Sequence, residues 1–233
     1  MAENTGPTAP DPSRGSVRGH TNARGAAGGA EAPASDIVFM TDFGLDDWYV
    51  ATMKAVARAI APGAALLDLT HEIAQGDTMQ ADFVLAQAAP WFRDGTVVCV
   101  VVDPGVGSKR RALACGDGRR FYVGPDNGVF SSVARRAGNL WVCHEIANPD
   151  WRLPDLSSTF HGRDLFAPCA AWLAREPDLE RCGPRVYDPV LLDEALPSPA
   201  GRNRWKGEIL HVDRFGNAIT SFQMRRPPFD GER

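Results

Sequence analysis

The chain has 233 residues, enough for one large domain or for a medium domain with a small one. Hydrophobic residues make up 44% and charged residues 23% of it, as in ordinary globular proteins. The formal net charge of −4 excludes a broad basic surface, and no apolar run approaches the roughly 20 residues that cross a bilayer. We therefore expect a soluble protein with neither nucleic acid nor membrane as a partner.

The N-terminal segment, residues 1–35, consists largely of Gly, Ala, Pro, Ser and charged residues. It has almost no large apolar side chain and buries too little surface to offset chain entropy, so we predict a disordered tail. It also lacks the apolar stretch of a secretory signal.

Apolar runs then alternate with helical spacing. The sequence predicts a buried strand over 36–44, a helix over 46–63 with acidic residues at its start, and a second strand over 65–73. A second helix is predicted over 78–92. The β-branched run at 95–107 is typical of a third strand that is buried on both faces.

Short strands follow over 111–117 and 120–128, and a helix over 163–176 is predicted to close the domain. Strands that alternate with helices indicate an α/β domain over 36–176, with a mainly parallel sheet flanked by helices.

The rest of the chain differs in composition. Residues 177–205 are rich in Pro, Arg and Asp, have weak periodicity and predict a surface linker. Residues 206–233 are expected to begin a β-rich appendage, with a pair of strands joined by a turn within 205–222.

The five cysteines are widely spaced and form no CxxC pair. This pattern indicates buried thiols in a reducing compartment rather than a disulfide framework or a zinc site. We therefore expect a cytoplasmic protein.

Four polar clusters follow apolar strands at Gly-containing loops. The carboxyl ends of parallel strands meet at one edge of a sheet, so these clusters are expected to line one pocket. Carboxylates, His and Arg in such a crevice favour a hydrolase or transferase that acts on a polar small molecule. The clusters are Asp42 with Asp46 and Asp47, Asp103 with Arg110, the run from Phe160 to Asp164, and Asp213 with Asn217.

Simpler structural explanations exist for some of these residues. Asp46 and Asp47 are acids of the kind favoured at a helix start, and Asp103 before Pro-Gly suits a turn. His71 and His144 are expected to be hydrogen-bonded structural groups.

His161 differs from these two histidines because Gly162 beside it permits close approach of a ligand and Arg163 adds charge. A metal site built from Asp42, Asp46, His71 and His161 is an alternative, although the spacing matches no dedicated ligand motif.

Six motifs in order over residues 37–222 carry a family resemblance: MTDFGLDDWYV, DLTHEI, VVDPGVGSKRR, GPDNG, STFHGRDLFAP and VDRFGNAITSF. Together they resemble the S-adenosyl-L-methionine (SAM) hydroxide adenosyltransferases, relatives of the SAM-dependent fluorinase and chlorinase. The resemblance implies that water or hydroxide attacks C5′ of the ribose and displaces L-methionine, giving adenosine. The leaving thioether is neutral, so neither a metal nor a cofactor is expected.

The resemblance also implies site residues. Asp103, Arg110 and His161 correspond to the set that holds the nucleophile in the hydrolytic branch. The halogenase branch has Tyr at the position of Asp103, and a carboxylate there would repel a halide, which favours water. Substrate-binding positions implied by the family are Asp42 for the ribose hydroxyls, Asp46 and Asp213 for the methionine ammonium, Phe160 and Phe215 as aromatic walls, Gly162 beside C5′, and Asn217 as a polar contact.

Family members continue past the FGN loop into a complete β domain that contributes to the adenine pocket, usually across a homotrimer interface. This chain ends at Arg233, so the resemblance implies a homotrimer with a truncated appendage. The alternative is a catalytically impaired family member that only binds adenosine-like ligands or partner subunits.

Overall fold

A computed structural model describes residues 34–222 of the chain. Nearly all of the predicted tail, and residues 223–233 of the predicted appendage, lie outside the described residues. Ala34 and Ser35 belong to the folded domain: Ala34 packs against the core, and the Ser35 amide donates a hydrogen bond to the Ala174 carbonyl at 2.8 Å.

The central sheet has seven strands within the described residues, in the order β2-β1-β3-β5-β4-β6-β7. Strands β2, β1, β3 and β5 run parallel, and antiparallel pairing adds β4, β6 and β7. This confirms the predicted α/β class with a mainly parallel sheet, to which an antiparallel edge is added. The strands are β1 (Ile37–Thr41), β2 (Leu66–Thr70), β3 (Val97–Val101), β4 (Ala112–Gly116), β5 (Phe121–Pro125), β6 (Val142–Glu145) and β7 (Arg185–Val186).

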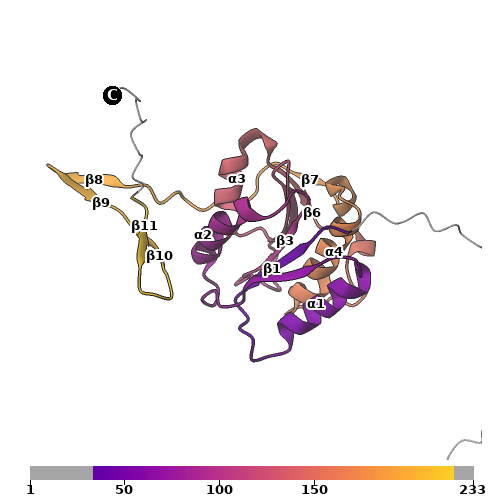
Figure 1. Ribbon diagram of the computed structural model, residues 1–233. Coiled ribbons are helices and arrows are strands. Elements are labelled where there is room, and N and C mark those ends of the chain that lie inside the picture. The colour runs from indigo at the N-terminus through magenta and orange to yellow at the C-terminus, as the bar shows by residue number, and fades with distance from the viewer. Residues whose placement is uncertain (1–33, 223–233) are drawn as a thin grey trace, which may run out of the picture. The chain divides into compact units, whose positions relative to one another are not determined.

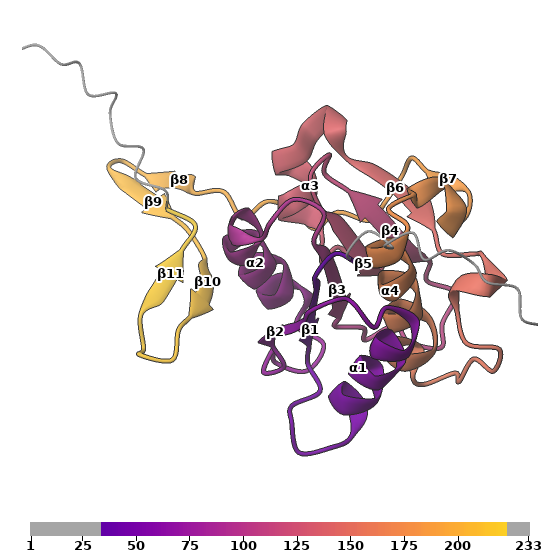
Figure 2. The ribbon, with the colours of Figure 1, turned by 45° about the vertical axis from the view of Figure 1, so that its right-hand side comes forward.

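Helices cover both faces of this sheet (Figure 1). Helices α1 (Tyr49–Ile60) and α4 (Ala167–Arg175) pack on one face, and α2 (Thr78–Ala88) and α3 (Ser131–Ala137) on the other. The view in Figure 2 shows the same layers after a turn about the vertical axis. None of the helices within residues 34–222 is long and apolar enough to cross a membrane.

The strand period of two explains how one strand serves both layers. In β1, Ile37 and Phe39 join the core under α1 and α4, whereas Val38 and Met40 join the core under α2. Strand β3 is likewise buried along its whole length, as its β-branched run predicts. The two layers therefore fix the register of the strands that end at the candidate site.

The first helix begins later than the sequence predicts. Its first residue is Tyr49, so Asp46 and Asp47 lie in the preceding loop and no acidic residue occupies the first turn. The predicted helix over 163–176 is also divided: a π-helical turn, Gly162–Phe166, precedes α4. Short 3-10 turns occur at Ala89–Trp91, Gly138–Leu140, Pro149–Trp151 and Leu179–Cys182.

Part of the predicted linker belongs to the main sheet, because β7 pairs with β6. The following residues form a hairpin of β8 (Ser198–Gly201) and β9 (Arg204–Lys206). A second hairpin joins β10 (Ile209–Val212) to β11 (Ala218–Thr220) and confirms the predicted strand pair.

Candidate active site

The candidate site lies at the carboxyl ends of the parallel strands. Strand β1 has β2 on one side and β3 on the other, so the chain reverses its direction of travel across the sheet at β1. Open α/β sheets bind ligands at such a switch point, beyond the carboxyl ends of the strands. Asp42 directly follows β1, and Asp103 lies two residues after β3.

A cavity of about 430 Å³ opens at this position. Its walls come from four loops that are far apart in the sequence but follow or face the same strand ends. The lining residues are Asp42, Phe43, Tyr49, Gln75, Gly76, Val101, Asp103, Pro104, Val106, Thr159, His161 and Gly162.

A continuous polar chain runs along one wall of the cavity. The Arg110 guanidinium donates to both carboxylate oxygens of Asp103, with Nε 2.9 Å from Oδ1 and 3.0 Å from Oδ2. Its Nη2 also contacts Oδ2 of Asp103 and lies 2.8 Å from Nδ1 of His161. The structure thus brings together the three residues whose types and positions the family resemblance singled out.

This contact determines the tautomer of His161. A guanidinium N–H can only donate, so Nδ1 accepts, and in the neutral ring the proton is on Nε2. Burial and the nearby Arg110 cation both lower the pKa of His161 from its usual value of 6.5, and they outweigh the opposing effect of Asp103. At neutral pH the ring is therefore an uncharged donor through Nε2.

The two loops that carry these residues pack tightly against each other. Gly107 has a φ of +77°, and a Cβ at that position would lie 2.7 Å from the Ser158 carbonyl oxygen. A Cβ on Gly162 would lie 3.1 Å from the Met53 sulfur. Gly107 therefore lets the loop after β3 approach the loop that bears His161, and Gly162 lets that second loop approach α1.

Asp164 fixes the loop of His161 from within the protein. Its side chain is fully buried, and its carboxylate accepts hydrogen bonds from the Ser157 amide at 2.8 Å and from Nε of Arg163 at 2.6 Å. Arg163 does not supply the charge beside a ligand that the sequence predicts: its guanidinium pairs with Asp164 and lies over the Phe160 ring at 4.9 Å.

Asp42 also lines the cavity. Its Oδ2 accepts a hydrogen bond from the Gly76 amide at 2.8 Å. Burial raises the pKa of Asp42, and the nearby Asp103 carboxylate adds to the effect, against the lowering by backbone hydrogen bonds. The carboxylate of Asp42 is thus positioned to accept further hydrogen bonds from a ligand.

His71 is a structural residue beside the Asp42 loop, as the sequence predicts, and its backbone carbonyl accepts a hydrogen bond from the Gly44 amide. Its Nδ1 lies 2.9 Å from the Thr41 hydroxyl and its Nε2 2.9 Å from Oδ1 of Asp68. Asp68 is also bound by Lys54, and these contacts lower its pKa although burial opposes them. His144 is likewise structural, because its Nδ1 lies 2.8 Å from the Gly183 carbonyl.

The aromatic wall of the cavity consists of residues that sequence reasoning missed. Phe43 and Tyr49 line it, with ring centroids 5.7 Å apart. Phe160 is only 8% exposed and lies behind them, 6.1 Å from Phe43 and 5.0 Å from Tyr49. The aromatic residues around the first loop were the available signal, since that loop follows a strand that ends at the site.

Other predicted residues do not line this cavity. Asp46 is exposed in the loop before α1. Asp213, Phe215 and Asn217 lie in the turn between β10 and β11, where Asp213 accepts hydrogen bonds from the backbone amides of the other two and from the Asn217 side chain. These bonds, chiefly those from Asn217, lower the pKa of Asp213. Asp213 thus ties the turn together, and the Phe215 ring is 89% exposed.

No cluster of three or more His, Cys, Asp or Glu side chains suited to a metal ion occurs between residues 34 and 222. The histidines of the alternative metal site have other partners: both ring nitrogens of His71 are hydrogen-bonded, to Thr41 and Asp68, and Nδ1 of His161 is bound to Arg110. The donor set that the alternative requires is therefore not assembled.

A crevice at the switch point of a parallel sheet, lined by Asp42, Asp103 and His161, the last two joined through Arg110, defines a small-molecule site of an α/β protein. Residues 37–183 match the family described as the SAM hydroxide adenosyltransferase N-terminal domain. The chain belongs to this family.

Individual relatives agree with this assignment. The chain is 43% identical over 189 residues to the (R)-S-adenosyl-L-methionine hydrolase of Salinispora tropica, covering 80% of this chain and 71% of the relative. It is 44% identical over 203 residues to the enzyme of the same name from Thermus thermophilus, covering 84% and 76%. A fluorinase of Nocardia brasiliensis is more distant, at 25% identity over 211 residues, with 79% and 70% covered.

Among solved structures, an uncharacterized conserved protein from Thermotoga maritima superimposes with a TM-score of 0.73 at 40% identity. The match covers 79% of this chain and 70% of that chain. The likeness confirms the fold within which the cavity lies.

Proposed function

We propose that this protein hydrolyses S-adenosyl-L-methionine to adenosine and L-methionine by attack of water or hydroxide at ribose C5′. The observation that carries the proposal is the Asp103-Arg110-His161 chain on the wall of a cavity in a member of the SAM hydroxide adenosyltransferase family. Relatives at 43% identity are named (R)-S-adenosyl-L-methionine hydrolase, which makes the (R) epimer the first substrate to test.

The reaction balances with few demands on the protein. The nucleophile's oxygen forms a bond to C5′ while the bond from C5′ to sulfur breaks. The electron pair of the broken bond goes to sulfur and neutralises the sulfonium. Water loses one proton, which passes to Asp103 or to solvent, and methionine leaves as a neutral thioether that needs no acid or metal ion. The protein then has to align the nucleophile with C5′ and sulfur and to limit bulk water around it.

In this proposal the Nε2–H group of His161 donates a hydrogen bond to the nucleophile's oxygen and keeps its proton, so that a lone pair on that oxygen is directed at C5′. Arg110 fixes the ring through Nδ1 and adds positive charge that favours hydroxide, while Asp103 holds the guanidinium. The carboxylate of Asp103 also disfavours a halide in the same place.

The remaining predicted residues are proposed to bind the substrate. Asp42 has hydrogen-bonding capacity left for the ribose hydroxyls, and Gly162, which lines the cavity, is proposed to lie beside C5′. We propose that Asp46 and Asp213 hold the methionine ammonium, that Phe160 and Phe215 give the pocket its aromatic character, and that Asn217 provides a polar contact.

We further propose a cytoplasmic homotrimer in which the turn between β10 and β11 completes the site of a neighbouring subunit. Apolar side chains exposed on the two hairpins support an interface: Trp205 is 63%, Ile209 64% and Phe215 89% exposed. If a site needs His161 from one chain and Phe215 from another, mixing inactive His161→Ala and Phe215→Ala chains restores about one quarter of the sites at random assembly. No recovery, or a monomer by light scattering, contradicts the trimer.

The decisive experiment incubates the purified protein with each sulfonium epimer of SAM in the presence of a chelator and follows adenosine and methionine by chromatography. Heavy-oxygen water distinguishes the bond that breaks, because attack at C5′ places the label in adenosine. Activity that the chelator abolishes would refute the metal-free reaction.

Adjacent arginines provide a matched pair of variants. Arg110→Gln is expected to abolish turnover, whereas Arg111→Gln is expected to retain it, because Arg111 pairs with Asp126 and Asp188 outside the cavity. A folded wild-type protein without adenosine formation would refute the hydrolase and leave the impaired, ligand-binding family member, which the named relatives do not favour.

A further inference from the structure

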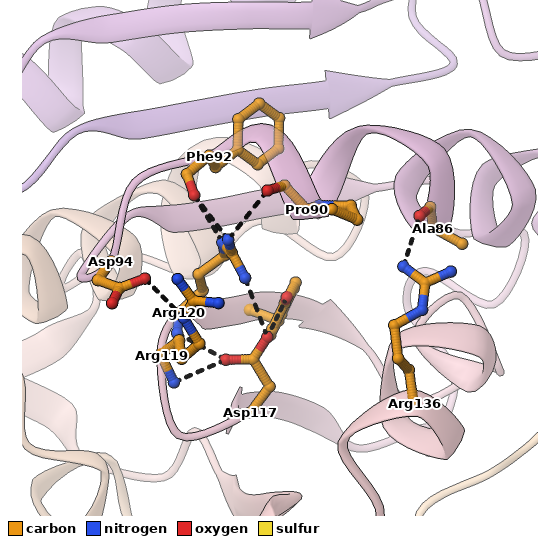
Figure 3. Close-up of polar contacts among 9 residues, drawn as sticks. Ala86, Pro90, Phe92, Asp94, Asp117, Arg119, Arg120 and Arg136 are labelled. Atoms are coloured by element: carbon orange, nitrogen blue, oxygen red, sulfur yellow. Dashed lines mark hydrogen bonds and ion pairs between the residues drawn. The ribbon is translucent and has the colours of Figure 1, made fainter. Parts of the chain in front are cut away.

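A second cavity, of about 300 Å³, lies on the α2 and α3 side of the sheet. Its polar wall includes the turn before β5, so it is at the amino end of that strand, whereas the candidate active site is at the carboxyl ends of the parallel strands. Three arginines line it, Arg119, Arg120 and Arg136, together with one carboxylate, Asp117 (Figure 3).

The carboxylate is already occupied. Asp117 accepts hydrogen bonds from the amides of Arg119 at 2.8 Å and Arg120 at 2.6 Å, and from the Tyr122 hydroxyl at 2.7 Å. These contacts hold the turn together. Its nearest approach to the Arg120 guanidinium, from Oδ2 to Nη1, is 3.7 Å, which is too long for a hydrogen bond.

Arg120 is therefore a buried cation whose ion pair with Asp117 is not hydrogen-bonded. Its side chain is 7% exposed, and Nε and Nη2 donate to the backbone carbonyls of Phe92 and Pro90. Neutral carbonyls satisfy donors but do not neutralise charge. A desolvated guanidinium favours an anion nearby.

The positive charges of the other two arginines, Arg136 and Arg119, are only weakly compensated by carboxylates. Arg136 donates from Nη1 to the Ala86 carbonyl at 2.9 Å. The nearby Asp82 carboxylate, which is hydrogen-bonded to Ser132, interacts with Arg136 only through their charges. Arg119 pairs with Asp94, but both side chains are 64% exposed, so water screens this pair strongly. Figure 3 shows Arg119 and Arg120 on one side and Arg136 on the other.

The rest of the lining is apolar. Val133, Ala137 and Leu140 contribute from the α3 region, and Ala89 and Pro90 from the end of α2. Leu140 is 65% exposed and is available for contact. A volume of about 300 Å³ is at the lower end of the range for small-molecule sites.

We propose that this second cavity binds a small organic oxyanion, with its charged group between Arg120 and Arg136 and its apolar part on Val133 and Leu140. Guanidinium groups recognise phosphate and carboxylate oxygens through paired N–H donors, so both groups share the required chemistry. The inference is independent of the proposed function, because it concerns another cavity and its test measures binding.

The test titrates the full-length protein with phenyl phosphate, benzoate and inorganic phosphate and follows methyl groups by NMR. The methyl signals of Val133 and Leu140 are expected to shift with saturation for at least one organic anion, while those of Val101 and Val106 in the candidate active site stay in place. The anion that binds more tightly identifies phosphate or carboxylate. Weaker binding of inorganic phosphate indicates a contribution from the apolar part.

Arg136→Gln is expected to weaken binding about tenfold, the loss of one charge-assisted contact. Arg58→Gln is the matched control: Arg58 also lies in the last turn of a helix and donates to a backbone carbonyl, that of Pro62, but on the other face of the sheet. The absence of saturable shifts up to roughly 10 mM, equal weakening by Arg58→Gln, or shifts only at Val101 and Val106 would each overturn the proposal.

Discussion

Replacement of Asp103 by Asn tests whether the Asp103-Arg110 pair carries both stability and catalysis. The two side chains are 5% and 10% exposed, so the pair is buried. Asn keeps the shape and one acceptor oxygen but removes the negative charge. Besides one hydrogen bond to the Asn oxygen, the buried Arg110 cation then keeps its contacts with the Arg111 carbonyl at 3.4 Å, the His161 ring at 2.8 Å and the Phe166 ring at 5.1 Å.

Removal of one partner from a buried ion pair costs about 3–5 kcal/mol. Because Asn still accepts one hydrogen bond, we expect the free energy of unfolding to fall by about 3 kcal/mol, the lower end of that range. For a chain of this size each kcal/mol lowers the melting temperature by about 2–4 °C, so the expected decrease is roughly 6–12 °C. Turnover should fall at least about a hundredfold, because Arg110 no longer fixes His161.

Urea unfolding and calorimetry measure the first effect, and adenosine formation measures the second. Asp188→Asn is the control, since Asp188 also pairs with an arginine, Arg111, but its side chain is 83% exposed. That variant is expected to unfold and to react like the wild type. If Asp103→Asn matches the control in both measurements, the Asp103-Arg110 pair contributes to neither stability nor catalysis, and the prediction is wrong.

Three further outcomes follow from the same geometry. Activity is expected to decline as the pH falls, with an inflection below pH 6.5, because the pKa of His161 is lowered and the ring stays neutral above that inflection. A second ring proton, on Nδ1, would face the Arg110 guanidinium. A pH profile with its inflection above 6.5 contradicts this prediction. Gly107→Ala is expected to lower the free energy of unfolding by about 1–3 kcal/mol. Gly138→Ala should cost less, because Gly138 also has a positive φ but no atom lies within 4 Å of the new Cβ. Equal losses in chemical denaturation would show that the Ser158 contact does not contribute to the cost at Gly107. Asp42→Asn should raise KM more than it lowers kcat in steady-state assays, and the reverse would assign Asp42 to the chemical step.

Much of the fold follows from hydrophobic periodicity. Strands β1 and β3 are continuous apolar runs, and a run buried on both faces has few alternatives in an α/β protein. The missed elements are those with weak local signals: β6 has four residues, including His144 and Glu145, and α3 spans only seven residues. Pairing with β4 and packing on the sheet, rather than their own composition, hold them in place.

The candidate site was predictable in part. Polar residues at strand ends, with the family resemblance, indicated Asp42, Asp103 and His161, and the structure places all three around one cavity. Which aromatic ring faces the cavity was not predictable from the sequence. Tyr49 and Phe160 contact each other, and tertiary packing alone decides that Phe160 is buried while Tyr49 lines the cavity. The tautomer of His161 likewise depends on a single tertiary contact.

Arg110 and Arg111 illustrate the limit most clearly. They are neighbours of the same residue type, yet the first binds Asp103 and His161 while the second binds Asp126 and Asp188. In extended chain, adjacent side chains point to opposite sides, so the pairing register of β4, with Ala112 opposite Pro125, decides which arginine reaches Asp103 and His161. A slip of one residue would exchange them and would move the buried side chains of β4 to the wrong faces. The hydrophobic core that fixes this register therefore also selects the arginine that binds His161.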